Sequence, residues 1–137
     1  MIKEIVSDTI TLSQKATLAT KDDLVVVQDL LDTIKAHEQA CVGMAANMIG
    51  VNKRIIVVND EGKYLVMLNP KVLKLTGNLY ETKEGCLSHV GTKSVKRYEK
   101  IKVEFLDENF KIKIKTFSDY TAQIIQHELD HCEGILI

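Results

Sequence analysis

Proline, cysteine and net charge are scarce in this chain, and long apolar runs are missing. With one Pro, no low-complexity stretch and no internal repeat, the sequence offers no linker, so we expect a single domain over residues 1–137. The three cysteines are an odd number in a chain without export signals, which favours reduced thiols or metal ligands over a disulfide framework.

The formal net charge is −1, so no overall electrostatic field favours nucleic acid or an anionic membrane as a partner. No apolar stretch is long enough for a secretory signal or a transmembrane span, so we expect a cytoplasmic protein. Hydrophobic residues make up 45% and charged residues 27%, which is ordinary for a globular domain and argues against disorder.

Residues 21–38 are predicted to form an amphipathic helix. Thr20 and Asp23 have the spacing of a capping box, which satisfies free backbone groups at a helix start. Apolar residues then recur at helical spacing, at Leu24, Val27, Leu31 and Ile34.

The chain then changes to the two-residue period of strands. Residues 54–59 and 64–68 are β-branched and apolar on either side of Asp60-Glu61-Gly62, which predicts a hairpin. A last helix is predicted over residues 120–132, capped by Ser118 or Asp119. Helix, antiparallel strands and helix together indicate an α+β fold. The other predicted strands cover residues 72–75, 93–106 and 111–117.

The most informative segment is Gln126-His127-Glu128-Leu129-Asp130-His131 on the predicted last helix. Four residues turn a helix through about 400°, so His127 and His131 project from one face and can share a divalent metal. Glu128 follows the first histidine and can reach a water in the open position of that metal. The alternative to a metal site is a solvent-exposed helix whose charged residues only pair with one another, and the apolar residues near the histidines argue against it.

A catalytic metal of this kind needs a third protein ligand, and Cys86 is the candidate. A lone Cys is usually a small buried hydrophobe, but beside the histidine pair a thiolate completes a Cys-His-His set. Cys132 points about 100° away from its neighbour His131 around the helix, and Cys41 precedes a Gly-rich turn, so both are weaker candidates. The segment from Cys41 to Gly50 is rich in small residues, which is by itself a weak signal for a substrate loop.

Taken together, these segments resemble the peptide deformylase family over nearly the whole chain. The family has three motifs, G-x-G-x-A-A-x-Q, E-G-C-L-S and H-E-x-x-H. The second stands complete at Glu84–Ser88 and the third at His127–His131, in the family's order. The resemblance implies a compact α+β domain in which antiparallel sheets pack around the H-E-x-x-H helix.

The resemblance also implies an activity, which is removal of the N-formyl group from the N-terminal methionine of new proteins. Cys86, His127 and His131 would bind one divalent metal, generally Fe²⁺, with Zn²⁺ or Ni²⁺ also able to occupy the site. Glu128 would act as general base and then general acid, and the backbone N–H of Leu87 would donate to the developing oxyanion. The implied partners are formylmethionyl ends of nascent chains and a transient ribosome contact, with no stable nucleic-acid binding and no membrane.

The first motif departs from the family. Aligning Gly43 on it places Met48 where the family has Gln, and methionine cannot donate the hydrogen bond of that amide. Losing one such donor typically costs on the order of 10²–10³ in rate. A hypothesis left open is that the neighbouring Asn47 supplies an amide instead, which requires that the backbone turn it inward. The remaining predicted substrate contacts are Gly43, Met44, Arg97 and Ile125, while His89 is predicted to be an exposed loop residue.

Two other functions stay open on the sequence. A divergent metal amidase or peptidase would use Met48 to change its acyl preference. A non-catalytic metal-binding or ribosome-associated module would have lost the activity, although a purely structural site has no need of Glu128.

Overall fold

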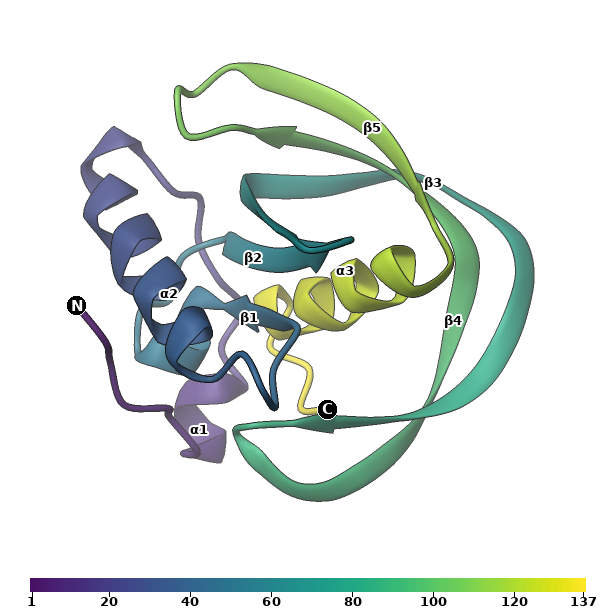
Figure 1. Cartoon of the computed structure of the whole chain (residues 1–137), viewed down its shortest axis with the longest axis horizontal. Helices are drawn as coiled ribbons and strands as arrows, with labels where there is room; N and C mark the ends of the chain where they lie inside the picture. The colour runs from purple at the N-terminus through teal and green to yellow at the C-terminus, as the bar shows by residue number, and fades with distance from the viewer.

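The computed structural model describes residues 1–137, and its five strands form one antiparallel sheet in the order β1-β2-β3-β4-β5. The sheet curls around the C-terminal helix α3, while helix α2 lies beyond β1 and β2 on the other side (Figure 1). The helical elements are α1 (Thr9–Leu12), η1 (Lys21–Asp23), α2 (Leu24–Ala36), η2 (Ala46–Ile49) and α3 (Asp119–Cys132). The strands are β1 (Gly43–Ala45), β2 (Ile55–Asp60), β3 (Lys63–Cys86), β4 (His89–Leu106) and β5 (Ile112–Ser118).

The predicted α+β class is confirmed, but the strands belong to one sheet where the resemblance implied several. The predicted strands 64–68 and 72–75 are parts of the single 24-residue strand β3, which ends at Cys86 inside the second motif. Four register shifts interrupt its pairing with β4. Bulges of this kind bend a strand and increase its twist, so they allow one sheet to wrap a helix.

The predicted hairpin between β2 and β3 is confirmed. Asp60 pairs with Lys63, which leaves Glu61 and Gly62 as a two-residue turn. Both turn residues have positive φ, 51° and 94°. This is the backbone that a tight hairpin turn matching the strand twist requires, and Gly at the second position adopts it without strain.

Strand β2 is buried on both faces, which explains its unbroken apolar run. Ile56 and Val58 belong to a core between the sheet and α3, whereas Ile55 and Val57 belong to a second core beneath α2. The predicted amphipathic helix is confirmed and is two residues shorter than expected at its end, since η1 and α2 together cover residues 21–36. At its start, the backbone N–H of Thr20 donates to the Asp23 carboxylate over 2.8 Å.

Two short elements, β1 and η2, occupy the segment that the sequence predicted only as turn-rich. Strand β1 pairs with β2 alone, so its outer edge is free. Gly50 ends η2 with a φ of 85°, a left-handed conformation that favours glycine.

Helix α3 begins one residue earlier than predicted. No helix in the chain is long and apolar enough to cross a bilayer.

Candidate metal centre and active site

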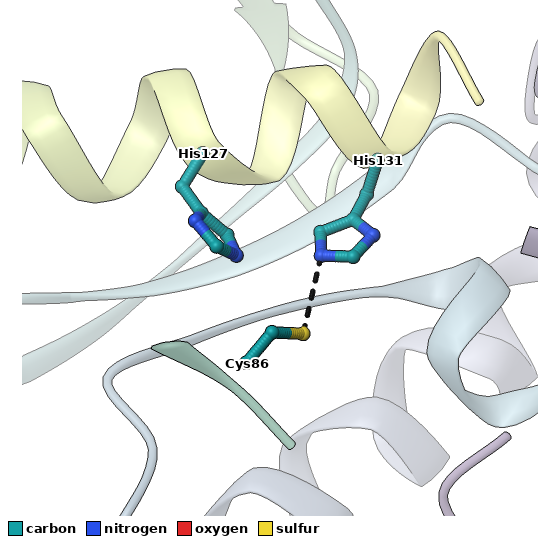
Figure 2. Close-up of side chains that lie close together, drawn as sticks. All are labelled: Cys86, His127 and His131. Atoms are coloured by element: carbon teal, nitrogen blue, oxygen red, sulfur yellow. Dashed lines mark hydrogen bonds between the residues drawn. The ribbon is translucent and has the colours of Figure 1, made fainter. Parts of the chain in front are cut away.

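The two histidines of α3 face the same side of the helix, one turn apart, as their spacing predicted. Both are buried, and their ring centroids lie 5.1 Å apart. Figure 2 shows both rings projecting from the helix toward the end of β3. The helix therefore presents two imidazoles to one point in space.

Cys86, the last residue of β3, meets these imidazoles (Figure 2). Its Sγ lies 3.4 Å from Nε2 of His131, and one ligand atom from each of Cys86, His127 and His131 lies within 4.8 Å of the others. Two ligands at ordinary Zn–S and Zn–N distances around a tetrahedral ion would be about 3.5 Å apart. The Cys-His-His set therefore fits a divalent metal in spacing as well as in donor chemistry.

The outer nitrogen of His127 is held by a buried carboxylate. Nδ1 of His127 lies 2.7 Å from Oε1 of Glu84, which leaves Nε2 of the ring for a metal. Glu84 and Cys86 are two residues apart in β3, so both point to the same side of the strand. Carboxylates in this outer position fix the tautomer and orientation of a ligating imidazole.

Arg97, on β4, binds the same Glu84 carboxylate. Its Nε and Nη2 donate to the two oxygens of Glu84 over 3.1 and 2.7 Å, and its Nη1 donates to Asp130 over 2.6 Å. Since Asp130 lies on α3 between the two histidines, Arg97 ties the metal-facing helix to the sheet. The guanidinium is nearly inaccessible to solvent, with 6% of its side chain exposed.

Burial alone would raise the pKa of Glu84, but hydrogen bonds from His127 and Arg97 lower it to about 2. Burial opposes the charge of His127, yet the neighbouring Cys86 and the hydrogen-bonded Glu84 raise its pKa to about 10. Burial lowers the pKa of His131 to about 3, so this ring is neutral and ready to coordinate. Glu84 is therefore a fixed anion, and a bound cation would take the place of the proton on His127.

Glu128 has the environment of a proton carrier. Its side chain is buried, its Oε1 has no hydrogen-bond partner, and burial raises its pKa to about 7. A Cβ added to Gly43 would lie 2.7 Å from Oε2 of Glu128 and 2.7 Å from a methyl of Ile124. The absence of a side chain at Gly43 is thus what lets β1 lie against this face of α3.

Gln126 fixes the register of α3 on the sheet. Its Nε2 donates to the carbonyl of Tyr98 and its Oε1 accepts from the N–H of Tyr98, both over 2.9 Å. The pairing of β5 with β4 ends at Lys100, so this amide satisfies the next exposed backbone groups of β4. The helix is therefore positioned by direct bonds as well as by apolar packing.

A cavity of about 750 Å³ opens beside the metal centre, between the segment 38–43, the end of β3 and α3. The predicted site residues that line it are Gly43, Met48, Cys86, Leu87, His127 and Glu128. Glu128, Cys86 and His127 thus line the same cavity as Gly43 and Met48, the two residues aligned on the first motif.

Four predicted substrate contacts lie away from this cavity. Met44 and Ile125 are fully buried in the two cores, as is expected of packing residues. Asn47 is buried and its Nδ2 donates to the carbonyl of His131 over 3.0 Å, so its amide supports the end of α3. Arg97 is committed to Glu84 and Asp130, as described above.

His89 is not the exposed loop residue that the sequence predicted. It is the first residue of β4, pairs with Cys86 across the hairpin, and is only partly exposed. Burial, followed by the charges of Lys93 and His127, lowers its pKa. The reason is that β3 and β4 continue to residues 86 and 89, which leaves only a two-residue turn.

Sequence reasoning missed two residues around the site. It gave no role to Glu84, although the two-residue period of a strand places it beside Cys86. It also missed Gln123, one turn before His127 on α3, which lines the cavity and accepts a hydrogen bond from Tyr80 over 3.0 Å. The helical period from His127 is the signal that points to Gln123.

The chain is similar to known proteins in sequence and in fold. The sequence model described as polypeptide deformylase matches residues 2–137. A peptide deformylase of Clostridium beijerinckii is 53% identical over all of both chains, and peptide deformylase 1 of Clostridium perfringens is 40% identical over 82% of this chain and 76% of its own. A class I type b peptide deformylase from Acinetobacter baumannii, with Met-Ala-Ser bound, matches 99% of this chain and 97% of its own with a TM-score of 0.89 and 26% identity. The deformylase of Thermotoga maritima, at 23% identity and a TM-score of 0.90, shares the fold.

Proposed function

The chain belongs to the polypeptide deformylase family and is an enzyme of that kind, and we propose which of its residues perform the reaction. The whole of residues 1–137 forms one catalytic domain. Cys86, His127 and His131 hold one divalent metal. The observation that carries the proposal is the convergence of these three side chains beside Glu128, a buried carboxylate with one unpaired oxygen.

A divalent metal in this site supplies Lewis acidity, which makes water a stronger nucleophile and polarises a carbonyl. The donor set of one thiolate and two imidazoles suits Fe²⁺, Zn²⁺ and Ni²⁺ by softness. We propose Fe²⁺ as the ion in the cell, with Zn²⁺ or Ni²⁺ in preparations.

Glu128 moves the protons. With a pKa near 7 it accepts a proton from the attacking water at neutral pH and returns it to the leaving amine, which is the behaviour that general acid–base catalysis requires. Gly43 leaves room for this carboxylate against β1. Glu84 keeps its charge throughout, and holds the ring of His127 still while the proton moves on Glu128.

The oxyanion is stabilised by the backbone N–H of Leu87, which lines the cavity beside Cys86. Met48 lines the same cavity and offers no donor there, and Asn47 gives its amide to the end of α3. We therefore assign the backbone N–H of Leu87, without a side-chain amide from this loop, to the charge on the carbonyl oxygen.

The substrate is the N-formylmethionyl end of a nascent chain in the cytoplasm, met transiently near the ribosome. A peptide that begins with Met is bound in the Acinetobacter baumannii relative. The free outer edge of β1 borders the cavity, and an extended peptide can lie along such an edge. Gly43, Met48 and the cavity-facing side of α3 then surround its first residue.

The test is formate release from a formyl-Met peptide by anaerobically prepared protein, measured beside Glu128→Gln with the bound metal quantified in both. Because Gln keeps the shape and removes the base, we expect kcat to fall by on the order of 10²-fold or more at equal metal content. Equal activity in the two proteins would remove Glu128 from the mechanism. Preference for an acetyl-Met over a formyl-Met peptide would indicate a different amidase, and full metal occupancy without turnover a non-catalytic module.

A further inference from the structure

Gln123 is a polar side chain in the wall of the cavity, and the reaction as proposed gives it no role. Gln123 lies on α3 one turn before His127, so the two share a face of the helix. Its Oε1 accepts the hydroxyl hydrogen of Tyr80 over 3.0 Å, whereas its Nε2 has no hydrogen-bond partner. The Tyr80 contact therefore fixes the orientation of the amide and leaves its donor side free at the wall of the cavity.

The spacing of Gln123 and His127 along α3 matches the length of the first side chain of the substrate. Four residues of helix span about 6 Å along the axis. From a formyl carbon held at the metal, the path through the amide nitrogen, Cα, Cβ and Cγ brings the sulfur of a methionine on the order of 6 Å away. The peptide main chain follows the free edge of β1, which leaves the face of α3 to the side chain. On that face Ile124 offers apolar contact and Gln123 an unpaired donor.

We propose that Gln123 is a specificity-determining residue, whose Nε2 donates to an acceptor at the δ position of the substrate's first side chain. The inference rests on the proposed function. A methionine thioether is a weak acceptor, and the oxygen of methionine sulfoxide is a strong one, whereas the methylene of norleucine is none. The site therefore ranks side chains of nearly equal length by their acceptor strength.

The experiment compares formyl-Met-Ala-Ser, formyl-norleucine-Ala-Ser and formyl-Met-sulfoxide-Ala-Ser, with kcat/KM from formate release by the metal-loaded enzyme. The variants are Gln123→Leu and the nearly isosteric Gln123→Met, with Gln28→Leu as the matched control. Gln28 is exposed on α2 and bonds only to Asp32, so its loss should change nothing in the cavity.

We expect both Gln123 variants to lower the ratio of Met to norleucine by about 3- to 10-fold, as the loss of one neutral hydrogen bond does. The ratio of sulfoxide to norleucine should fall further, because its oxygen would be left unpaired in the cavity. Tyr80→Phe should give a smaller change in the same direction, since the amide stays but loses its orientation. Ratios that stay within twofold of the parent in both Gln123 variants would overturn the proposal.

Affinities of the product peptides Met-Ala-Ser and norleucine-Ala-Ser, measured by calorimetry, separate this proposal from the reaction itself. They report on Gln123 even in a preparation that releases no formate. A parent enzyme that binds both peptides equally would contradict the role of Gln123 and leave the deformylase activity untouched. If no formate is released but the parent binds Met-Ala-Ser more tightly and Gln123→Leu abolishes this preference, the role of Gln123 is supported and the deformylase activity is contradicted.

Discussion

Arg97 is the residue whose removal should cost this domain the most stability outside its apolar cores. It joins β3, β4 and α3 through three short hydrogen bonds to Glu84 and Asp130. In Arg97→Met the aliphatic stem is kept but the carboxylate of Glu84 loses its buried cation. The remaining partner of that carboxylate is His127.

The magnitude follows from burial. Only 6% and 7% of the Arg97 and Glu84 side chains are exposed, and breaking a buried pair by removing one partner typically costs about 3–5 kcal/mol. The pKa of Glu84 agrees in direction, because hydrogen bonds from His127 and from Arg97 lower it to about 2 in spite of burial. Such a loss is a large part of the roughly 5–15 kcal/mol that holds a domain folded.

The assay is urea unfolding of metal-free protein at neutral pH. The chain has no Trp, so far-UV circular dichroism is the suitable signal. Exposed Lys102→Ala serves as the control and should change the free energy of unfolding little. The double variant Glu84→Gln/Arg97→Met should lose less than the sum of the two single losses, because each single variant leaves one charge unpaired. A loss below about 1 kcal/mol for Arg97→Met, or strict additivity, would refute the reasoning.

Two further outcomes are expected. Gly43→Ala should lower kcat at least about 10-fold with metal content unchanged, because its Cβ would lie 2.7 Å from atoms of Glu128 and Ile124 and displace the base. Formate release and metal analysis measure this effect. An unchanged kcat would contradict it and show that the carboxylate is free to move. The free energy of unfolding of metal-free protein should fall in acid, since the pKa values of Glu84 and His131 are about 2 and 3 in the folded state, below their ordinary 4.5 and 6.5. Between about pH 7 and 4.5 the raised pKa of Glu128 lets the folded chain take up a proton, which offsets the loss from His131. The decline is therefore expected below about pH 4.5, where the unfolded chain binds more protons through both His131 and Glu84. Urea unfolding over a pH series measures it, and a flat profile below pH 4.5 would contradict it.

Contacts within one element were predictable from the sequence. A helix repeats every 3.6 residues, so His127 and His131 had to share a face of any helix that contains them, with Glu128 beside the first. The hairpin turn at Glu61-Gly62 was equally local, because its backbone conformation depends on the two residues that form it. These predictions needed no knowledge of the rest of the chain.

Long strands were harder to predict where tertiary contacts stabilise them. The second half of β3 is mostly exposed and carries Gly77 and Gly85, so it lacks both the apolar run that marked β2 and the alternation that marked β4. Its partner β4 holds it extended, and the bulges between them depend on that pairing. The strand therefore became visible only with its neighbour in place.

What the sequence by itself determined was the chemistry of the donors and which of them share one helix. Only the tertiary structure decided that Cys86, 45 residues before His131, arrives 3.4 Å from it, and that Arg97 and Ile125 are turned away from the cavity while Gln123 lines it. The physical reason is that periodicity fixes directions within an element, whereas the meeting of two elements depends on the register and curl of the whole sheet.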